Sequence, residues 1–220
     1  GVPPSGIAGR RVFGWSVADQ AAAQETRATL YADAPVQSHH EFESWVAQTF
    51  AATRPNEIWV ADITYVPTTE GWLYLAGVKD LHTGEVVGHA MNARMTTDLV
   101  RQALLMAVGA KRPRPGLIHH SDRGSQYCAQ DYQDQLQQFG LISSMSRRGN
   151  CYDNAPMESF WGTLKNELVH HRRYATRDQA RQEISAYIEL FYNRQRRHSR
   201  LGNCSPAAFA QQWARLQPAA

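Results

Sequence analysis

The segment Glu57–Val66 places the strongest constraint on how this chain can fold. Side chains alternate between the two faces of a β-strand, and here both faces are mostly apolar. One face carries Trp59, Ala61, Ile63 and Tyr65, and the other carries Ile58, Val60, Asp62, Thr64 and Val66. This pattern predicts a central strand that is covered on both sides. Asp62 is the exception, because burying a lone carboxylate costs several kcal/mol unless it is paired or binds a cation.

Shorter patterns predict the elements around this strand. Trp72–Val78 and Glu85–Met91 are expected to be strands, and Thr96–Asp98 begins a helix. The expected apolar face of that helix consists of Leu99, Ala103, Met106 and Ala110. The expected order continues with a strand at Leu117–Ser121, a helix at Ala129–Phe139, a strand at Leu141–Met145, and helices at Pro156–Val169, at Arg177–Asn193 and from Pro206. The helix Arg177–Asn193 has an expected apolar face of Ile184, Tyr187, Ile188 and Phe191.

This order indicates an α/β fold with a mixed five-stranded sheet flanked by helices. Strands joined by short turns are antiparallel, whereas strands reached through a helix are expected to be parallel. The order matches the ribonuclease H-like fold, although other folds share it. We expect an irregular N-terminal extension at residues 1–53, a core at 54–170 and a C-terminal helical extension at 171–220.

Charge is distributed unevenly along the chain. The net charge of +3 barely indicates a partner, but residues 147–200 hold eleven Lys and Arg against six Asp and Glu, whereas residues 1–50 hold three against five. The asymmetry favours a polyanionic partner for the C-terminal third, although a solvated helical face would look the same. The three cysteines fit free thiols in a reducing cytosol. No apolar run is long enough to span a membrane, so we expect a cytoplasmic protein.

Two further acids stand where ligand sites occur. Asp122 follows an apolar strand, at the carboxyl end where α/β sheets place their ligands. Glu158 lies in the first turn of a helix, where the helix dipole favours a carboxylate. Each acid alone is more simply a capped or salt-bridged carboxylate. Together with Asp62 they offer the hard oxygen ligands that Mg²⁺ prefers, and phosphodiester chemistry uses two such cations about 3.5–4 Å apart.

The sequence motifs around these acids resemble those of one family. Asp122 and Glu158 are separated by 35 residues, as in the Asp-Asp-35-Glu pattern of retroviral integrases. The chain is similar to the OrfB transposases of the insertion-sequence-three family over roughly residues 53–212. The motifs that carry this resemblance are Trp59–Tyr65, His119–Tyr127, Asn154–Ser159, Tyr192–Arg194 and Arg197–Ser199, followed by Ser205-Pro206.

The resemblance implies an integrase-like catalytic core that cleaves the 3′ ends of an insertion sequence and transfers them to target DNA. Asp62, Asp122 and Glu158 would bind two Mg²⁺ ions per active site, with Mn²⁺ as a substitute. Lys165 lies two helical turns after Glu158, and it would contact the element's DNA end. Arg123 could reach a phosphate or form a salt bridge, and Arg147 with Arg148 would lie in a flexible DNA-touching loop.

The chain departs from the family pattern at few positions. Tyr152 and Trp161 stand where Trp and Phe are expected, and residues 1–50 show none of the family's helix-rich N-terminal region. In the family, the specificity helices lie upstream. We therefore expect, as partners, DNA, an upstream-frame product with a helix-turn-helix, and further copies of this chain assembled on DNA. Bound to DNA, the protein would associate with the nucleoid.

Two alternative functions stay open. The chain could be a ribonuclease H-like nuclease that hydrolyses without joining, or a DNA-binding remnant without catalysis. A hydrolytic triad that combines His119, His120 and Asp122 with Ser121 or Ser125 is disfavoured. Neighbouring strand residues point to opposite faces, and no Gly-x-Ser-x-Gly motif is present.

Overall fold

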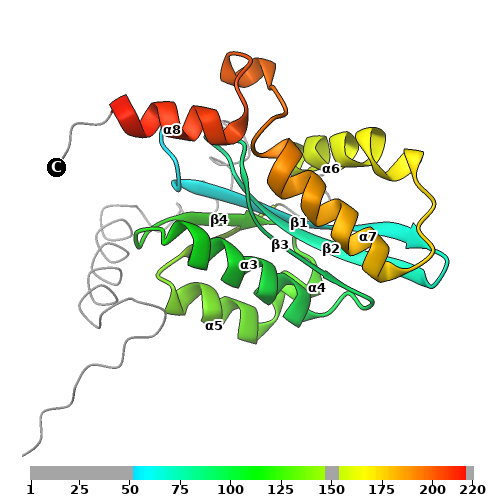
Figure 1. Ribbon diagram of the computed structural model, residues 1–220. Helices are drawn as coiled ribbons and strands as arrows, with labels where there is room; N and C mark the ends of the chain where they lie inside the picture. Colours follow the sequence, from blue (N-terminus) through cyan, green and yellow to red (C-terminus); the bar gives the residue numbers. More distant parts are fainter. Residues whose placement is uncertain (1–51, 147–153, 217–220) are drawn as a thin grey trace, which may run out of the picture.

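The computed structural model describes residues 52–146 and 154–216. Its centre is a five-stranded sheet in the order β3-β2-β1-β4-β5 (Figure 1). The strands are β1 (Ile58–Thr68), β2 (Gly71–Asp80), β3 (Val86–Asn92), β4 (Ile118–Ser121) and β5 (Ile142–Met145). β1 to β3 pair antiparallel, whereas β4 pairs parallel with both β1 and β5. The mixed sheet predicted from the sequence is therefore confirmed.

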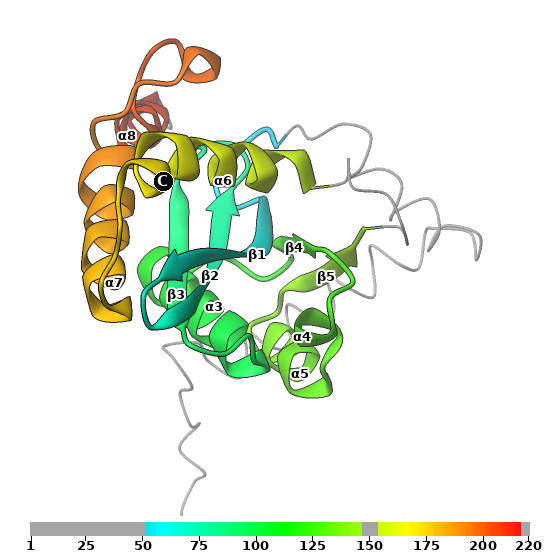
Figure 2. The ribbon, with the colours of Figure 1, turned by 90° about the vertical axis from the view of Figure 1, so that its right-hand side faces the viewer.

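Helices cover both faces of the sheet (Figure 2). One face is covered by α3 (Thr97–Lys111), α4 (Ser125–Cys128) and α5 (Gln130–Gln138), and the other by α6 (Ala155–Glu167) and α7 (Arg177–Ala186). The chain continues through a π-helical turn η3 (Tyr187–Tyr192) to α8 (Pro206–Leu216), with short 3-10 turns η2 (Val169–His171) and η4 (Ser199–Leu201) between helices. Among the described residues, no helix is long and apolar enough to cross a membrane. The division at residues 53/54 and 170/171 stays a prediction.

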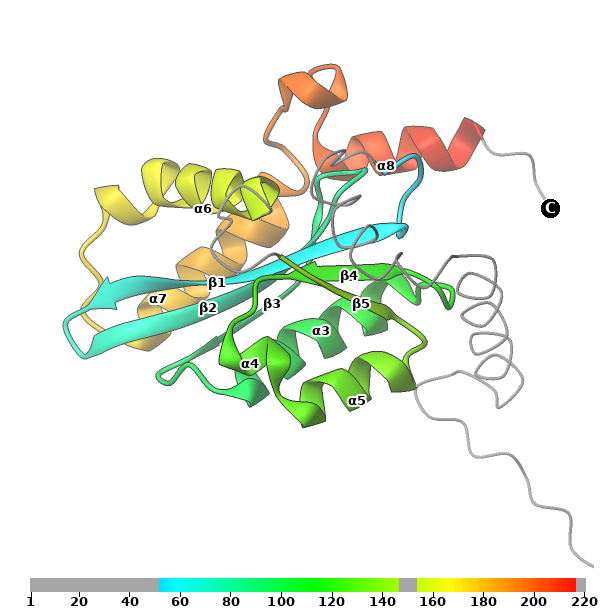
Figure 3. The ribbon, with the colours of Figure 1, turned by 180° about the vertical axis from the view of Figure 1, so that it is seen from behind.

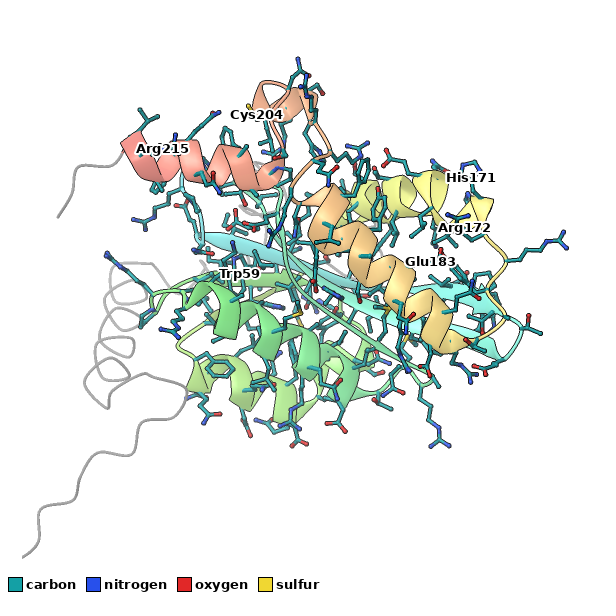
Figure 4. The ribbon with its side chains drawn as sticks, in the orientation of Figure 1. Trp59, His171, Arg172, Glu183, Cys204 and Arg215 are labelled. Atoms are coloured by element: carbon teal, nitrogen blue, oxygen red, sulfur yellow. The ribbon has the colours of Figure 1, made fainter. Side chains whose placement is uncertain are left out.

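The alternating pattern of β1 divides the core into two parts. Trp59 and Ala61 belong to a buried cluster with α3, α4 and α5, and Trp59 lies between the sheet and these helices (Figure 4). Val60 and Val66 point to the opposite face, where they pack with α6 and α7. β1 is thus the central, doubly covered strand that its sequence predicts, and Asp62 falls on the α6 side.

Two predicted helix faces are wrong in part. In α3, Met106 is 40% exposed and Ala110 is also exposed, because the buried stripe consists of Leu99, Val100, Ala103, Leu104, Ala107 and Val108. Met106 lies about 100° from the centre of that stripe. Phe191 is 41% exposed while Tyr192 is buried. The π-helical turn explains this, since its wider i→i+5 geometry turns the next residue inward.

The hairpin of β1 and β2 extends beyond β4 and is held by the segment that follows α6 (Figure 3). Thr69 N donates to the Tyr174 carbonyl at 3.0 Å. Arg177 Nε donates to the Trp72 carbonyl at 3.1 Å, and its Nη2 donates to the Glu70 carbonyl at 2.6 Å. Arg172 pairs with Glu183 of α7 at 3.2 Å, which ties this segment to the helix (Figure 4).

Gly88 of β3 allows α3 to lie unusually close to the sheet. A Cβ at this position would collide with the Ala103 carbonyl oxygen and would lie 2.7 Å from the backbone nitrogen of Ala107. Both obstacles are helix backbone, so they cannot turn away as a side chain would. The closeness of α3 to the sheet therefore depends on this glycine.

We predict that Gly88→Ala lowers the free energy of unfolding by about 3 kcal/mol, because overpacking a tight backbone contact displaces α3. The control is Gly109→Ala in α3, where a Cβ meets nothing within 4 Å. That change is expected to raise stability by about 0.5–1 kcal/mol. Urea denaturation measures both, and equal effects of the two variants would contradict the prediction.

Candidate active site

Asp62 and Asp122 lie side by side where the parallel pairing of β1 and β4 ends. The last register pair of these strands is Ala61 with Ser121. Asp62 follows Ala61 and Asp122 follows Ser121, and neighbouring strands lie about 4.8 Å apart. The register therefore places both acids at the same position of the sheet, with Asp62 largely buried and Asp122 exposed.

Local hydrogen bonds fix the turn that carries Asp122. Its Oδ1 accepts from the backbone N–H of Gly124 at 2.9 Å, and a Cβ on that glycine would lie 3.0 Å from the same oxygen. Arg123 Nε donates to the Ser146 carbonyl at 2.7 Å, which ties the turn to the end of β5. The carboxylate is thus oriented by its own turn.

Glu158 is positioned by the start of α6, which is attached to two strands. Asn154 Nδ2 donates to the Ala61 carbonyl at 3.1 Å, next to Asp62. The buried Lys79 of β2 donates from Nζ to the Pro156 carbonyl, also at 3.1 Å. These bonds place the first turn of α6, with its exposed Glu158, at the edge where Asp62 lies.

The three acids interact electrostatically. The pKa of Asp62 is raised from 3.8 to about 6, first by burial and further by the negative charges of Asp122 and Glu158. Hydrogen bonds from the Ile63 backbone and the Trp161 side chain oppose this rise. Within residues 52–146 and 154–216, however, no three His, Cys, Asp or Glu side chains are close enough to form a coordination shell. The acids share one edge without closing into a shell.

Comparisons with known proteins agree with this geometry. Two models described as integrase core domain match the chain, one over residues 52–151 and one over residues 140–206. The chain is 66% identical over 166 residues to the insertion element IS600 uncharacterized 31 kDa protein of Shigella sonnei. The matched residues make up 76% of this chain and 61% of that protein. The chain contains an integrase core domain, and over about three quarters of its length it is similar to a protein of an insertion element.

Other relatives extend this assignment. The transposase for insertion sequence element IS904 of Lactococcus lactis is 51% identical, with 74% of this chain and 65% of that protein covered. Transposase InsF for insertion sequence IS3A of Escherichia coli is 49% identical, with 76% and 58% covered. The chain thus spans about three-fifths of the length of these curated relatives.

Solved structures show the same fold. An intasome of simian T-cell lymphotropic virus in complex with a PP2A regulatory subunit matches with a TM-score of 0.63 and 19% identity, covering 77% of this chain and 59% of that chain. The HTLV-2 integrase catalytic core domain, solved with magnesium in a trimeric form, matches with a TM-score of 0.57 and 16% identity, covering 73% and 99%. The ribonuclease H-like fold predicted from the sequence is therefore confirmed.

Against this family background, Trp161 is a departure that touches the site. Its indole N–H donates to Oδ2 of Asp62 at 2.9 Å. Gly77, which pairs with Asp62 across β1 and β2, makes room for the ring, since a Cβ there would lie 2.8 Å from it. The phenylalanine that the family pattern predicts at this position cannot donate a hydrogen bond. Motif comparison marked Trp161 as a substitution but could not assign it this contact.

The cationic residues predicted to bind DNA have different surroundings. The Lys165 ammonium lies 5.1 Å from the centre of the Tyr65 ring, on the same helix as Glu158. Arg123 bonds to the end of β5, as described above. Arg147 and Arg148 lie outside the described residues. The DNA-binding roles of all four stay predictions, as do the catalytic and metal-binding roles of the three acids.

The two neighbouring histidines of β4 are buried and form hydrogen bonds in the core. His120 is fully buried and bonds through its two ring nitrogens to the hydroxyls of Ser144 and Ser146. His119 bonds to the Tyr132 hydroxyl at 3.1 Å, and burial lowers its pKa to about 3. Both rings therefore help to fix β4, and with it the turn of Asp122.

Sequence reasoning missed Lys79 and Asn154 as residues that place α6. A signal for Lys79 was present, because a lysine within the apolar strand that follows Trp72 requires a buried partner. In the sequence, Asn154 stands out only as the first residue of the motif Asn154–Ser159. Its bond to β1 joins residues 93 positions apart, which local sequence does not reveal.

The raised pKa of Asp62 predicts a pH-dependent stability. The carboxyl binds its proton more tightly in the folded chain, so its contribution to stability is present below pH 3.8 and is lost as the pH rises through about 6. Without metal, Asp62→Asn should be more stable than the wild type at pH 7.5 by up to about 3 kcal/mol. The difference should vanish near pH 4. Thermal denaturation in EDTA measures it, and a constant difference at both pH values would contradict it.

Trp161→Phe tests the hydrogen bond to Asp62. Removing a donor from a charged acceptor costs about 1.5–3 kcal/mol, so this variant should be less stable at pH 7.5, where Asp62 is ionised. At pH 4 only the smaller packing loss should remain. Urea denaturation in EDTA measures both values, with Trp213→Phe on α8 as the matched control. An equal loss at the two pH values would show that the indole contributes packing alone.

Proposed function

We propose that this chain is the catalytic core of a DNA transposase, which cleaves 3′ ends of an insertion sequence and joins them to target DNA. The observation that supports this most strongly is the meeting of Asp62, Asp122 and the start of α6 at one open edge of an integrase-like sheet. Similarity to insertion-sequence transposases makes phosphodiester chemistry the reaction to expect there.

The donor set fits hard divalent cations. It consists of carboxylate oxygens, which Mg²⁺ prefers and Mn²⁺ accepts. The raised pKa of Asp62 also fits, because a nearby cation would offset the cost of three acids at one edge. Asp62 and Asp122 would hold one ion, and Glu158 with either of them a second. Such ions, when bound, supply activation of the attacking oxygen and stabilisation of the leaving oxygen.

The remaining residues hold the acids and bind DNA. Trp161 orients the Asp62 carboxylate, Asn154 and Lys79 hold the turn of Glu158, and Gly124 orients Asp122. Among the cations, Lys165 lies nearest in sequence to the proposed catalytic helix turn and would contact a phosphate of the element's end. Arg123, Arg147 and Arg148 would contact further phosphates.

The site is an edge rather than a deep pocket. A cavity of about 650 Å³ lies between β3, α3, η3 and α8, but none of the three acids lines it. An open edge suits a duplex, which is too wide for an enclosed cavity of a chain this size. We therefore place the DNA at the acids and assign no substrate to that cavity.

The proposed assembly has more than one component. Terminal-repeat recognition would come from an upstream-frame product with a helix-turn-helix, as the resemblance to the insertion-sequence-three family implies. Further copies of the chain would assemble on DNA. In support, the HTLV-2 integrase catalytic core domain has been solved in dimeric and trimeric forms. The complex would act on bacterial DNA in the cytoplasm, associated with the nucleoid.

The charge-removing changes Asp62→Asn, Asp122→Asn and Glu158→Gln should each abolish cleavage and strand transfer, because each removes a proposed metal ligand. The assay uses Mg²⁺ and a pre-cleaved donor end, which separates joining from hydrolysis. Asp131→Asn, the same change at an exposed acid of α5, should retain activity.

Two outcomes would favour the alternatives. Hydrolysis without joining by the wild-type chain would indicate a ribonuclease H-like nuclease. DNA binding without any metal-dependent nicking would indicate a remnant without catalysis. Retained activity in one acid variant would remove that residue from the proposed set.

A further inference from the structure

Two aromatic side chains on the β1–β2 hairpin are exposed although the chain has an ample core to bury them. Tyr65 is 54% exposed and Trp72 is 49% exposed. Their rings meet edge to face, with centroids 4.9 Å apart. We call Tyr65 and Trp72 together the aromatic edge. Single exposed apolar residues are common on any protein, but two large aromatic side chains exposed side by side are typical of a binding surface.

The aromatic edge is held rigidly. The Trp72 carbonyl accepts from Arg177 Nε, and the Arg177 backbone N–H donates to the Glu70 carboxylate at 2.9 Å. The strand pairing of β1 and β2 continues to Thr68 and Gly71, at the end of the hairpin. The rings are therefore presented by a fixed backbone, which lowers the entropic cost of binding something flat.

The aromatic edge adjoins the proposed active site. Tyr65 follows Asp62 by three residues, which is about 10 Å along a strand, or about three base-pair steps of B-form DNA. The two side chains belong to opposite faces of β1, but β4 stops pairing at Ala61 and leaves this edge of the strand open. Lys165 reaches across this open edge. It lies on α6, which covers the Asp62 face, and its ammonium sits 5.1 Å from the centre of the Tyr65 ring.

We propose that the aromatic edge stacks with unpaired nucleobases at the end of the DNA that occupies the active site. This inference rests on the proposed function and adds a subsite to it. Bases in an intact duplex cover each other's faces, so only unpaired bases can stack on protein rings. The ammonium of Lys165 beside the rings complements the phosphates of such a strand. A purely apolar protein partner would leave that charge unmatched.

The test uses the full chain and two fluorescent DNA duplexes, one blunt and one with an unpaired 3′ extension that ends in 2-aminopurine. The wild type should bind the extended duplex more tightly and quench its fluorescence by stacking. Tyr65→Ala and Trp72→Ala should each weaken binding of the extended duplex by about five- to 150-fold, the range for one lost base stack. Binding of the blunt duplex should stay within about twofold.

Three comparison variants separate stacking from other effects. Trp72→Phe retains a ring and should recover most of the affinity. Phe191→Ala removes an aromatic ring of similar exposure on η3 and should change neither duplex. Lys165→Ala should weaken both duplexes and lower the salt dependence by about one phosphate contact.

Several results would overturn the inference while leaving the proposed function intact. These are an unchanged preference for the extended duplex in Trp72→Ala and Tyr65→Ala, or an equal loss on both duplexes. A change in self-association by sedimentation velocity, with DNA binding unchanged, would reassign the aromatic edge to contact with a second copy. Failure of the wild type to bind or nick any DNA would instead count against the proposed function itself, and the inference would fall with it.

Discussion

The parallel pairing of β1 with β4 is the interaction on which the rest of this structure depends. The pairing ends at Ala61 and Ser121, and the next residue after each of them is an acid. Beyond Ala61 the strand β1 loses one neighbour, which converts a buried central strand into an open edge within a few residues. The sheet interior thus supplies rigidity to Asp62, while the missing neighbour supplies access.

Helix α6 completes the site because it is fastened to this sheet through polar contacts as well as apolar ones. Met157, Phe160 and Leu164 bury its inner face in the second core. Apolar packing alone permits small sliding movements, but directional hydrogen bonds do not. The bonds of Asn154, Lys79 and Trp161 therefore define the position of the helix along β1 and β2. The family fold sets the frame, and these three residues set where Glu158 stands within it.

Much of the fold follows from local sequence patterns, and the misses have physical causes. The alternation in β1, the turns between the first strands and the helical crossovers were enough to predict a mixed sheet. The inward position of Tyr192 was not, because a π-helical turn changes which residue faces the core and leaves no periodic trace. Asp62 could be singled out as a buried acid, whereas its bond to Trp161 joins residues 99 positions apart and arises only from packing. Long-range polar contacts were in general the part that the sequence alone could not reveal.

The open edge of β1 also has a consequence for solubility. Between Asp62 and Pro67 no strand of the described chain pairs with the side of β1 that β4 abandons. Such an edge offers unpaired backbone groups to any strand of another molecule, which is a route to aggregation. Pro67 lacks an N–H to offer, and the charges of Asp62 and Lys165 discourage an incoming strand. Residues of the edge that we propose to bind DNA thereby also protect it from other polypeptides.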